Sequence, residues 1–515
     1  FQEQGVELAP GPKELMNMQR FYLYLNMTKP GEKLILSYSD TNAKGEGISP
    51  AYLIGSIRSL YPKLEIEGGG VRPHKNSINN YCYPENPEAG IDLFLEKLVQ
   101  ETEKEHEDIL EQADETDAMF GELYSWYLRN PEYRSRVQKL VQSAFAGKPE
   151  DIISQSVAKA LYGEVSPYSA TRLERFAACA FAHFLQYGMK LTERVEYEFK
   201  PMDMGNVMHE ALESFAEEVR KRGMKWTELT EQERNEIADR CLDNIVADYG
   251  NTVLKSSARN EYMIERTRRI LRRTVWALQK QLEQGEFQPE GFEVTFGGGR
   301  IDRVDIMEDQ NKVYVKVIDY KTGNTSFDLV YLYHGLQLQL MIYLDGALRV
   351  EQKKYPDKEI IPAGVFYYNI KDPMIQEKID ADVEAVSAGL MKELKMNGLV
   401  QADPELVYRV DSSLGSIPVA FNKDGSFRKN SSVADRTQFA VLGRYVRTKI
   451  EKIRSSILEG DAEVSPYELG KKNACTYCPY MTVCGFDRRL SGYEFRRLKN
   501  FSDEELWKAF DREAE

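Results

Sequence analysis

The chain has 515 residues, of which 42% are hydrophobic and 11% aromatic. That is enough for packed cores and, at about 150 residues per domain, for roughly three domains. Its longest apolar runs fall well short of the ~20 residues that a membrane-spanning helix needs. A net charge of −14 argues against nonspecific binding of nucleic acid by the whole surface, but it does not exclude a local basic groove.

Cysteine usage points to a reducing compartment. Six cysteines in 515 residues are no disulfide framework, so we expect a cytoplasmic protein. No secretory signal opens the sequence. The chain begins with Phe1 rather than methionine, and we therefore expect it to be the back part of a longer polypeptide.

The front region begins with an apolar run at residues 33–38, which predicts a buried strand. A loop follows at residues 40–47. Ser49 and Pro50 then predict the start of a helix, with Ser49 as its cap and Pro50 at its first position. We expect this helix to continue through Leu60.

The rest of the front region, residues 91–160, has a helical pattern. Its acidic stretch near residues 101–117 predicts a solvated face. Residues 68–70 are three glycines and predict a turn. The sequence has no phosphate-binding loop of the G-x-x-x-x-G-K-[ST] kind, so we expect no nucleotide cradle here.

Two helical stretches open the second region, which begins near residue 166. The first, residues 169–190, contains Cys179. The second, residues 205–222, repeats apolar residues at helical spacing. These residues are Met208, Ala211, Leu212, Phe215 and Val219. His209 lies at the edge of this stripe, where a histidine is more often a half-buried surface residue than a ligand unless an acidic site lies close by.

A hairpin is the most informative part of the second region. A long polar helix is predicted up to Gln284, followed by a strand at residues 292–296. Residues 300–323 then predict two antiparallel strands joined by a polar turn at residues 308–311.

This hairpin places charged residues on its apolar faces. In the second strand the face formed by three valines continues to Asp319 and Lys321, because side chains alternate along a strand. In the first strand Asp302 shares a face with Val304 and Ile306. Burying unpaired charge is unfavourable, and a bound cation would offset that cost. The alternative is an ordinary hairpin with a structural ion pair.

Helices and strands alternate after the hairpin. A helix at residues 330–350 would carry Gln339 and Tyr343 on one face, since they are four residues apart. On the residues alone they could equally be polar edge residues. A strand is predicted at residues 363–369 and a helix at residues 381–396. This order indicates a mixed α/β domain with helices packed over a central sheet.

Three cysteines lie close together in the tail: Cys475, Cys478 and Cys484. This spacing predicts metal ligation, and both zinc and an iron–sulfur cluster need a fourth protein ligand. The nearest upstream histidine is His334, so we expect the fourth ligand from a distance. The candidates are Cys82, Cys179 and Cys241.

Together these motifs resemble the RecB-like branch of the PD-(D/E)XK nucleases over most of the chain. Residues 169–181 (SATRLERFAACAF) are similar to the opening signature of that branch, and residues 205–209 (GNVMH) to its G-x-x-x-H helix. Residues 299–305 (GRIDRVD) and 318–323 (IDYKTG) are similar to its metal and catalytic motifs. Residues 339–343 match its Q-x-x-x-Y motif. With the front region included, the chain resembles the B subunits of AddAB helicase–nucleases.

The resemblance implies an α/β fold: a helicase-derived α/β region, then a nuclease domain whose mixed central sheet is flanked by helices and clasped by an iron–sulfur cluster. Residues 1–165 would be the C-terminal part of an inactivated helicase-like region, residues 166–490 the nuclease domain, and residues 491–515 a helical tail. Residues 20–37 resemble the closing motif of a superfamily-one helicase. There, residues 25–28 (LNMT) lack the ATP-contacting arginine, so we expect no ATP hydrolysis by this chain.

The resemblance also implies a Mg²⁺ site. The expected protein ligands are His209, Asp302 and Asp319, and the oxygen donors among them suit Mg²⁺. Lys321 would orient the attacking water and offset charge on the phosphate. Gln339 and Tyr343 would hold the strand backbone. Asp305 faces the other way by strand alternation and stays outside the metal shell.

For the cysteines, the resemblance implies iron rather than zinc. One cysteine before the nuclease core and three after it are typical of the iron–sulfur members of the family. The implied ligands of one [4Fe–4S] cluster are Cys179, Cys475, Cys478 and Cys484.

The implied function is that of a Mg²⁺-dependent deoxyribonuclease subunit, in a heterodimer with an AddA-like helicase–nuclease subunit. It would cut one strand, by resemblance the 5′-ended one, as the motor unwinds a double-strand DNA end, and leave a 3′ overhang for recombinational repair. A catalytically silent DNA-binding scaffold is one alternative, which the intact Asp302, Asp319 and Lys321 disfavour. A stand-alone RecB-like exonuclease is another, which the helicase-like front region disfavours.

Overall fold

The computed structural model describes residues 11–39, 48–64, 86–103, 115–144, 152–163, 169–192, 201–249, 257–297, 299–375, 382–488 and 492–514. The chain divides into two compact units, residues 1–97 with 112–137 and residues 98–111 with 138–515, and each is considered by itself. Within the described ranges, none of the helices combines the length and apolar character needed to cross a bilayer.

The first unit is helical. It contains α1 (Pro12–Thr28), α2 (Tyr52–Leu60), most of α3 (Pro87–Glu103), α4 (Glu115–Arg129) and the start of α5 (Pro131–Ala144). Phe94 of α3 is fully buried and stacks on Phe120 of α4 with ring centroids 4.9 Å apart. The Tyr127 hydroxyl donates a 2.6 Å hydrogen bond to the carbonyl of Pro87. These contacts form a small aromatic core between helices, and the helices agree with the helical pattern predicted for residues 91–160.

In the front region one predicted strand is absent, and one predicted helix is present and ends at Leu60 as expected but starts later. Residues 33–38 form no strand, and Ile35 is 75% exposed. A strand exists only by pairing with a neighbour, and these residues pair with none among those described. The helix predicted from Ser49 begins at Tyr52, with Ala51 at its N-cap and no side-chain cap. The predictions for residues 40–47 and 68–70, for most of the acidic stretch and for Cys82 lie outside the described residues.

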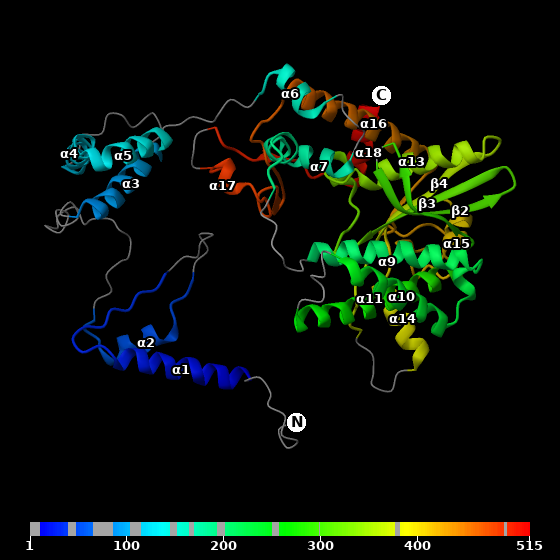
Figure 1. The fold of residues 1–515 in the computed structure, drawn as a ribbon, viewed down its shortest axis with the longest axis horizontal. Helices are drawn as coiled ribbons and strands as arrows, with labels where there is room; N and C mark the ends of the chain where they lie inside the picture. The colour runs from blue at the N-terminus through cyan, green and yellow to red at the C-terminus, as the bar shows by residue number, and fades with distance from the viewer. Residues whose placement is uncertain are drawn as a thin grey trace. The chain divides into compact units, whose positions relative to one another are not determined.

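A six-stranded mixed sheet is the centre of the second unit (Figure 1). Its strands follow one another in sequence order: β1 (Gln288–Phe296), β2 (Gly299–Asp309), β3 (Lys312–Lys321), β4 (Glu359–Asn369), β5 (Asn397–Gln401) and β6 (Val433–Ala434). The first three strands pair antiparallel, whereas β3 and β4 are parallel. A parallel pair needs a crossover connection, and here the connection between β3 and β4 contains two helices.

Helices cover both faces of this sheet, as Figure 1 shows. One face packs on α9 (Pro201–Lys221), α10 (Glu231–Asp248), α11 (Ala258–Glu283) and α15 (Pro404–Val410). The other packs on α6 (Gln155–Tyr162), α7 (Ala170–Ala178), α13 (Gln339–Lys354), α16 (Arg436–Glu459) and α18 (Asp503–Ala514). The predicted mixed sheet with flanking helices is thereby confirmed.

The alternation predicted for the hairpin is also confirmed. Val315 and Val317 of β3 belong to the core on the α13 side, while Ile318 and Tyr320 belong to the core on the α9 side. The predicted stripe of α9 is buried, with Phe215 fully covered. The remaining helix between β4 and β5, α14 (Val383–Glu393), agrees with the helix predicted at residues 381–396.

The helix predicted at residues 330–350 is two helices. A short α12 (Leu329–Tyr333) ends before Gly335, whose φ of 78° is the left-handed conformation that favours glycine. The next helix, α13, then begins at Gln339. The break was hidden because the apolar pattern continues through it. Its consequence is that Gln339 stands at a helix N-terminus rather than in a helix interior.

The segment containing Cys179 and the tail are irregular. Cys179 separates α7 from α8 (Ala180–His183) with an extended backbone at φ −166°, and a π-helical turn (Phe184–Gly188) follows. The tail contains a small sheet of β7 (Tyr467–Leu469), β8 (Lys472–Asn473) and β9 (Arg496–Arg497), and the short α17 (Met481–Cys484).

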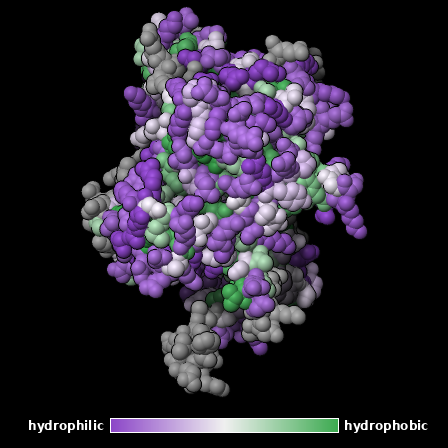
Figure 2. Space-filling view, turned by 90° about the vertical axis from the view of Figure 1, so that its right-hand side faces the viewer, coloured by the Kyte–Doolittle hydropathy of each residue, from purple (hydrophilic) through white to green (hydrophobic). Residues whose placement is uncertain are grey.

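The face in Figure 2 is largely hydrophilic, with hydrophobic side chains in small scattered areas only.

Candidate active site

Three elements bring one imidazole and two carboxylates together. Glu293 of β1 lies opposite Asp302 of β2, because Phe292 pairs with Arg303 on one side of this position. His209 comes from α9, with Nδ1 3.4 Å from Asp302 Oδ2 and 3.9 Å from Glu293 Oε1. The donor atoms of these three residues all lie within 4.8 Å of one another. Such a group can hold a metal ion, and it contains two of the three predicted ligands, with Glu293 in the place of Asp319.

Burial sets the electrostatics of this group. Asp302 is 8% exposed, and burial and the charge of Asp319 raise its pKa to about 7. Burial opposes protonation of His209, but the hydrogen bond with Glu293 and the charges of Asp302 and Asp319 outweigh it and raise the pKa of His209. The backbone N–H of Tyr320 donates a 2.7 Å hydrogen bond to Asp302 Oδ2 and fixes that carboxylate.

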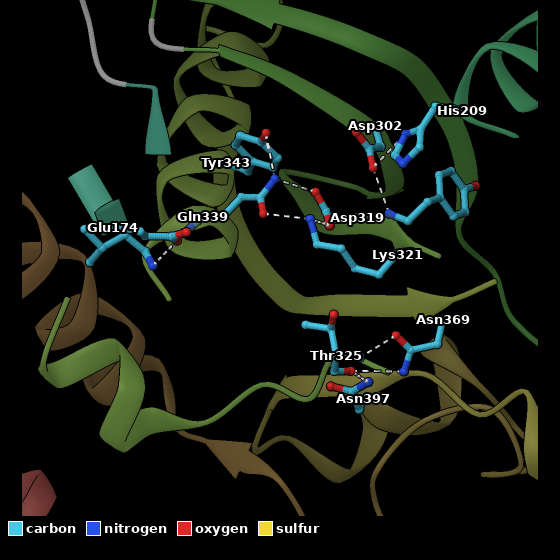
Figure 3. A network of polar contacts seen from close by, with 12 residues as sticks. Glu174, His209, Asp302, Asp319, Lys321, Thr325, Gln339, Tyr343, Asn369 and Asn397 are labelled. Carbon is cyan, nitrogen blue, oxygen red and sulfur yellow. Dashed lines mark hydrogen bonds and ion pairs between the residues drawn. The ribbon is translucent and has the colours of Figure 1, made fainter. Parts of the chain in front are cut away.

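A second polar group adjoins the first at the end of β3 (Figure 3). The Gln339 amide donates to Asp319 Oδ1 at 2.8 Å and to the Tyr343 hydroxyl at 2.9 Å. Its oxygen accepts a 2.8 Å hydrogen bond from Lys321 Nζ. Gln339 and Tyr343 therefore act on the side chains of Asp319 and Lys321, and not on the strand backbone as the resemblance implied.

The buried carboxylate of Asp319 faces the ammonium group of Lys321. Asp319 is 1% exposed, and burial raises its pKa although Lys321 opposes the shift. Its Oδ2 lies 2.7 Å from Lys321 Nζ, so an ammonium group already approaches this oxygen. The carboxylate oxygens of Glu293 and Asp302 and the imidazole of His209, next to this buried carboxylate, fit a hard divalent cation.

The site is open on one side. A groove of about 440 Å³ borders it at Tyr343. The residues lining this groove are Ser169, Ala170, Thr171, Phe296, Gly297, Gly299 and Tyr343. Lys321 is more accessible than the carboxylates beside it, since 28% of its side chain is exposed. A ligand in the groove can therefore approach the site from the side of Tyr343.

Asp305 lies on the opposite face of the hairpin, as predicted. It is fully buried between Arg303, whose Nε is 2.6 Å away, and Lys316, whose Nζ is 3.0 Å away. These two cations outweigh the effect of burial and hold the pKa of Asp305 below its usual value. This carboxylate is satisfied within the protein.

Sequence reasoning missed two carboxylates. Glu293 adopts a φ of 48°, unusual for a residue other than glycine, and its side chain also contacts Arg300 Nε at 2.5 Å. It is the one charged residue in the predicted strand 292–296, a signal that could have marked it. Glu174 of α7 accepts hydrogen bonds from the backbone N–H groups of Leu338 and Gln339. It belongs to the opening signature at residues 169–181, but nothing in that motif indicates its role.

Four cysteines line one small cavity beside α7. They are Cys179, Cys475, Cys478 and Cys484. All four are free. Among the described residues, His209, Glu293 and Asp302 are the only three candidate ligands with donor atoms all within 4.8 Å, so no three of the cysteine sulfurs are that close. Cys241 is buried elsewhere, in the core around α10, and takes no part in this cavity.

The fold and the site define a class of protein. The family model described as "PD-(D/E)XK nuclease superfamily" matches residues 167–485. That is more than half of the chain, and the chain belongs to this superfamily. PD-(D/E)XK nucleases generally use a divalent metal, in agreement with the donor set described above.

Curated relatives make the likeness more particular. The chain is 38% identical over 539 aligned residues to the B subunit of the ATP-dependent helicase/deoxyribonuclease of Lachnoclostridium phytofermentans, an alignment that covers 100% of this chain and 45% of the relative. Proteins of the same name from Alkaliphilus metalliredigens and Clostridium acetobutylicum are 31% and 32% identical, covering 100% and 99% of this chain and 46% and 45% of the relatives. The chain spans about half the length of the curated relatives it matches.

Proposed function

We propose that this chain is the nuclease part of the B subunit of an ATP-dependent helicase/deoxyribonuclease, working with a helicase–nuclease A subunit. It hydrolyses phosphodiester bonds of one strand, the 5′-ended one, as the partner unwinds a double-strand DNA end. The product is a 3′ overhang for recombinational repair. The names of the relatives support this assignment, and the five described cysteines, all free, support a reducing, cytoplasmic location.

The observation that carries the proposal is the group of His209, Glu293 and Asp302, whose donor atoms lie within 4.8 Å of one another beside the buried Asp319. The imidazole of His209 and the carboxylates of Glu293, Asp302 and Asp319 therefore lie near one another. Mg²⁺ suits such oxygen donors, lowers the pKa of bound water and stabilises charge on phosphoryl oxygens. By the family resemblance His209, Asp302 and Asp319 would hold it, and Glu293 is a further candidate ligand because its donor atom lies within 4.8 Å of those of His209 and Asp302.

The chain's own residues supply the rest of the chemistry. Lys321 lies within ion-pair distance of Asp319 and is held by Gln339, so its ammonium has a defined position. From there it orients the attacking water and offsets charge on the scissile phosphate. The groove at Tyr343 admits the strand to be cut. Tyr320 N–H keeps Asp302 in place throughout.

The cavity lined by Cys179 and the three tail cysteines holds one [4Fe–4S] cluster in this proposal. Four cysteines lining one cavity supply the four sulfur ligands that such a cluster needs, and the family resemblance favours iron over zinc. Cys478→Ala should therefore remove iron and increase proteolysis of the nuclease domain. Zinc in anaerobically purified protein, or full iron content in Cys179→Ala, would contradict the assignment.

The test of the proposed activity is digestion of end-labelled duplex DNA by the complete two-subunit complex. We expect Mg²⁺ and ATP to be required together, and the 5′-ended strand to be shortened. Loss of that cutting in Asp319→Ala, with cutting of the other strand retained, assigns it to this chain. Unchanged digestion of both strands by Asp319→Ala leaves the alternative of a catalytically silent DNA-binding scaffold. Efficient cutting without the partner subunit favours a stand-alone exonuclease.

A further inference from the structure

Helix α13 begins without a cap of its own. Its N-cap residue, Leu338, has helical backbone angles and makes no side-chain capping bond. The first N–H groups of a helix have no partner within the helix and need one from elsewhere. Glu174, on α7, provides it: its Oε1 accepts from the N–H of Leu338 at 2.7 Å and from the N–H of Gln339 at 3.0 Å. A residue 164 positions earlier in the chain thus caps α13.

The carboxylate of Glu174 is placed there at an energetic cost. The residue is partly exposed, but its carboxylate end is desolvated, and burial raises its pKa to about 7. The two backbone hydrogen bonds act in the opposite direction. The positive end of the α13 dipole also favours negative charge at this point. A surface residue without a function in positioning would leave the carboxylate in water.

The capped residue is the one that organises the catalytic groups. Gln339 joins Asp319 to Lys321 through its amide and also bonds Tyr343 (Figure 3). Its backbone and its side chain are therefore both fixed, the first by Glu174 and the second by the site. A displacement of about 1 Å at catalytic groups lowers rates by roughly 10²-fold. The geometry of Asp319 and Lys321 depends on this helix start.

The other end of α7 reaches the cysteine cavity. Glu174 stands five residues before Cys179, whose N–H closes the last turn of α7 by a 3.1 Å bond to the carbonyl of Arg175. Arg496 of the tail donates to the carbonyl of Ala177 in the same turn. One nine-residue helix thus connects the cavity to the cap of α13.

We propose that Glu174 is a positioning residue, which holds Gln339 in place and thereby fixes the positions of Asp319 and Lys321. The inference rests on the proposed function of this site and adds a residue to its machinery. Glu174 touches no reacting atom and acts through Gln339.

The test compares two substitutions in the complete complex. Glu174→Leu removes the acceptor and keeps apolar volume, whereas Glu174→Gln keeps an oxygen that accepts the two N–H groups. We expect Glu174→Leu to lower kcat for cutting of the 5′-ended strand roughly 10–100-fold at unchanged KM, and Glu174→Gln to lower it less than about threefold. Wild-type kcat in Glu174→Leu, or equal losses in both variants, would overturn the proposal.

Two further measurements separate positioning from general damage. Asp382→Ala removes a carboxylate cap from α14, where Asp382 accepts from Ala385 N–H at 2.7 Å, and serves as the matched control with kcat unchanged. Because Glu174 acts through Gln339, Glu174→Leu should add nothing to the loss in Gln339→Ala. Additive losses of kcat in the double variant would contradict an action of Glu174 through Gln339.

Hydrogen exchange makes the test independent of nuclease activity. Glu174→Leu should speed exchange of the amides of Leu338 and Gln339, while Asp382→Ala should leave them unchanged. This result is expected even if the complex fails to cut DNA, a failure that would count against the proposed function alone. Unchanged exchange of both amides in Glu174→Leu would overturn the positioning role itself.

Discussion

On the two faces of the β2–β3 hairpin, the pKa values of two buried aspartates are shifted in opposite directions. Asp302 and Asp305 are three residues apart on β2, and both are buried. The pKa of Asp302 is raised to about 7 by burial and by Asp319, whereas Arg303 and Lys316 hold the pKa of Asp305 below its usual value. The charge of Asp305 is neutralised within the protein by Arg303 and Lys316. The face that carries Asp302 and Asp319 leaves negative charge for a cation from solution, and that difference is what marks a site.

The largest expected effect comes from removing a carboxylate on the site face. Asp319→Ala should lower cutting of the 5′-ended strand by at least ~10³-fold, because it removes a cation ligand and the partner of Lys321. The fold should be retained, since an unfavourably buried charge is lost. Circular dichroism and end-labelled digestion measure both properties. Cutting at the wild-type rate would show that the site is elsewhere.

Removing the carboxylate on the opposite face should damage stability instead. Asp305→Ala leaves Arg303 and Lys316 buried without a partner, and we expect it to lower the free energy of unfolding by about 3–5 kcal/mol. Glu308→Ala is the control on the same hairpin, because Glu308 pairs with Lys358 at the surface and should matter little. Urea unfolding measures both variants. Equal stability of the two would remove the distinction between the faces.

The two aspartates should also respond to pH with opposite signs. Without metal, the raised pKa of Asp302 means that the unfolded state ionises first, so stability falls as pH rises from about 4 to about 7. Asp302→Asn should therefore match the wild type near pH 4 and exceed it at pH 8. The lowered pKa of Asp305 contributes stability above pH about 4 that is lost on further acidification. Unfolding in chelator at several pH values decides this, and identical curves for Asp302→Asn and wild type would contradict it.

The smallest effect is expected at the edge of the site. Glu293→Gln removes negative charge next to His209 and should raise the Mg²⁺ concentration needed for half-maximal cutting about tenfold. Glu290→Gln, on the same strand but paired with Lys354 at 2.8 Å on the surface, is the matched control. An equal response of the two variants would exclude Glu293 from the site.

Strand periodicity made the centre of the site predictable. Because side chains alternate strictly along a strand, the positions of Asp302, Asp319 and Lys321 followed from the hairpin pattern, and so did the exclusion of Asp305. His209 joined them only through the resemblance, since a histidine at the edge of a helix stripe is ambiguous by itself.

The rest depended on tertiary structure. Glu293 reaches the site from a left-handed backbone conformation that no local pattern announces. Glu174 finds its partners 164 residues away, at a helix start that exists because Gly335 breaks an apolar pattern. Residues 33–38 have the composition of a strand, but a strand also needs a neighbour. Long-range partners of this kind are not encoded in local spacing.

The most direct test of the central claim is calorimetric titration of the complex with a divalent cation. The heat of cation binding at this chain's site is the difference between the titrations of the wild type and of Asp319→Ala. We expect Asp319→Ala to bind less cation than the wild type. We expect Lys321→Ala to bind the cation like the wild type but no longer to cut DNA, because an ammonium is no ligand for a cation. Identical titrations of the wild type and Asp319→Ala would contradict the assignment of this face of the hairpin as a cation site.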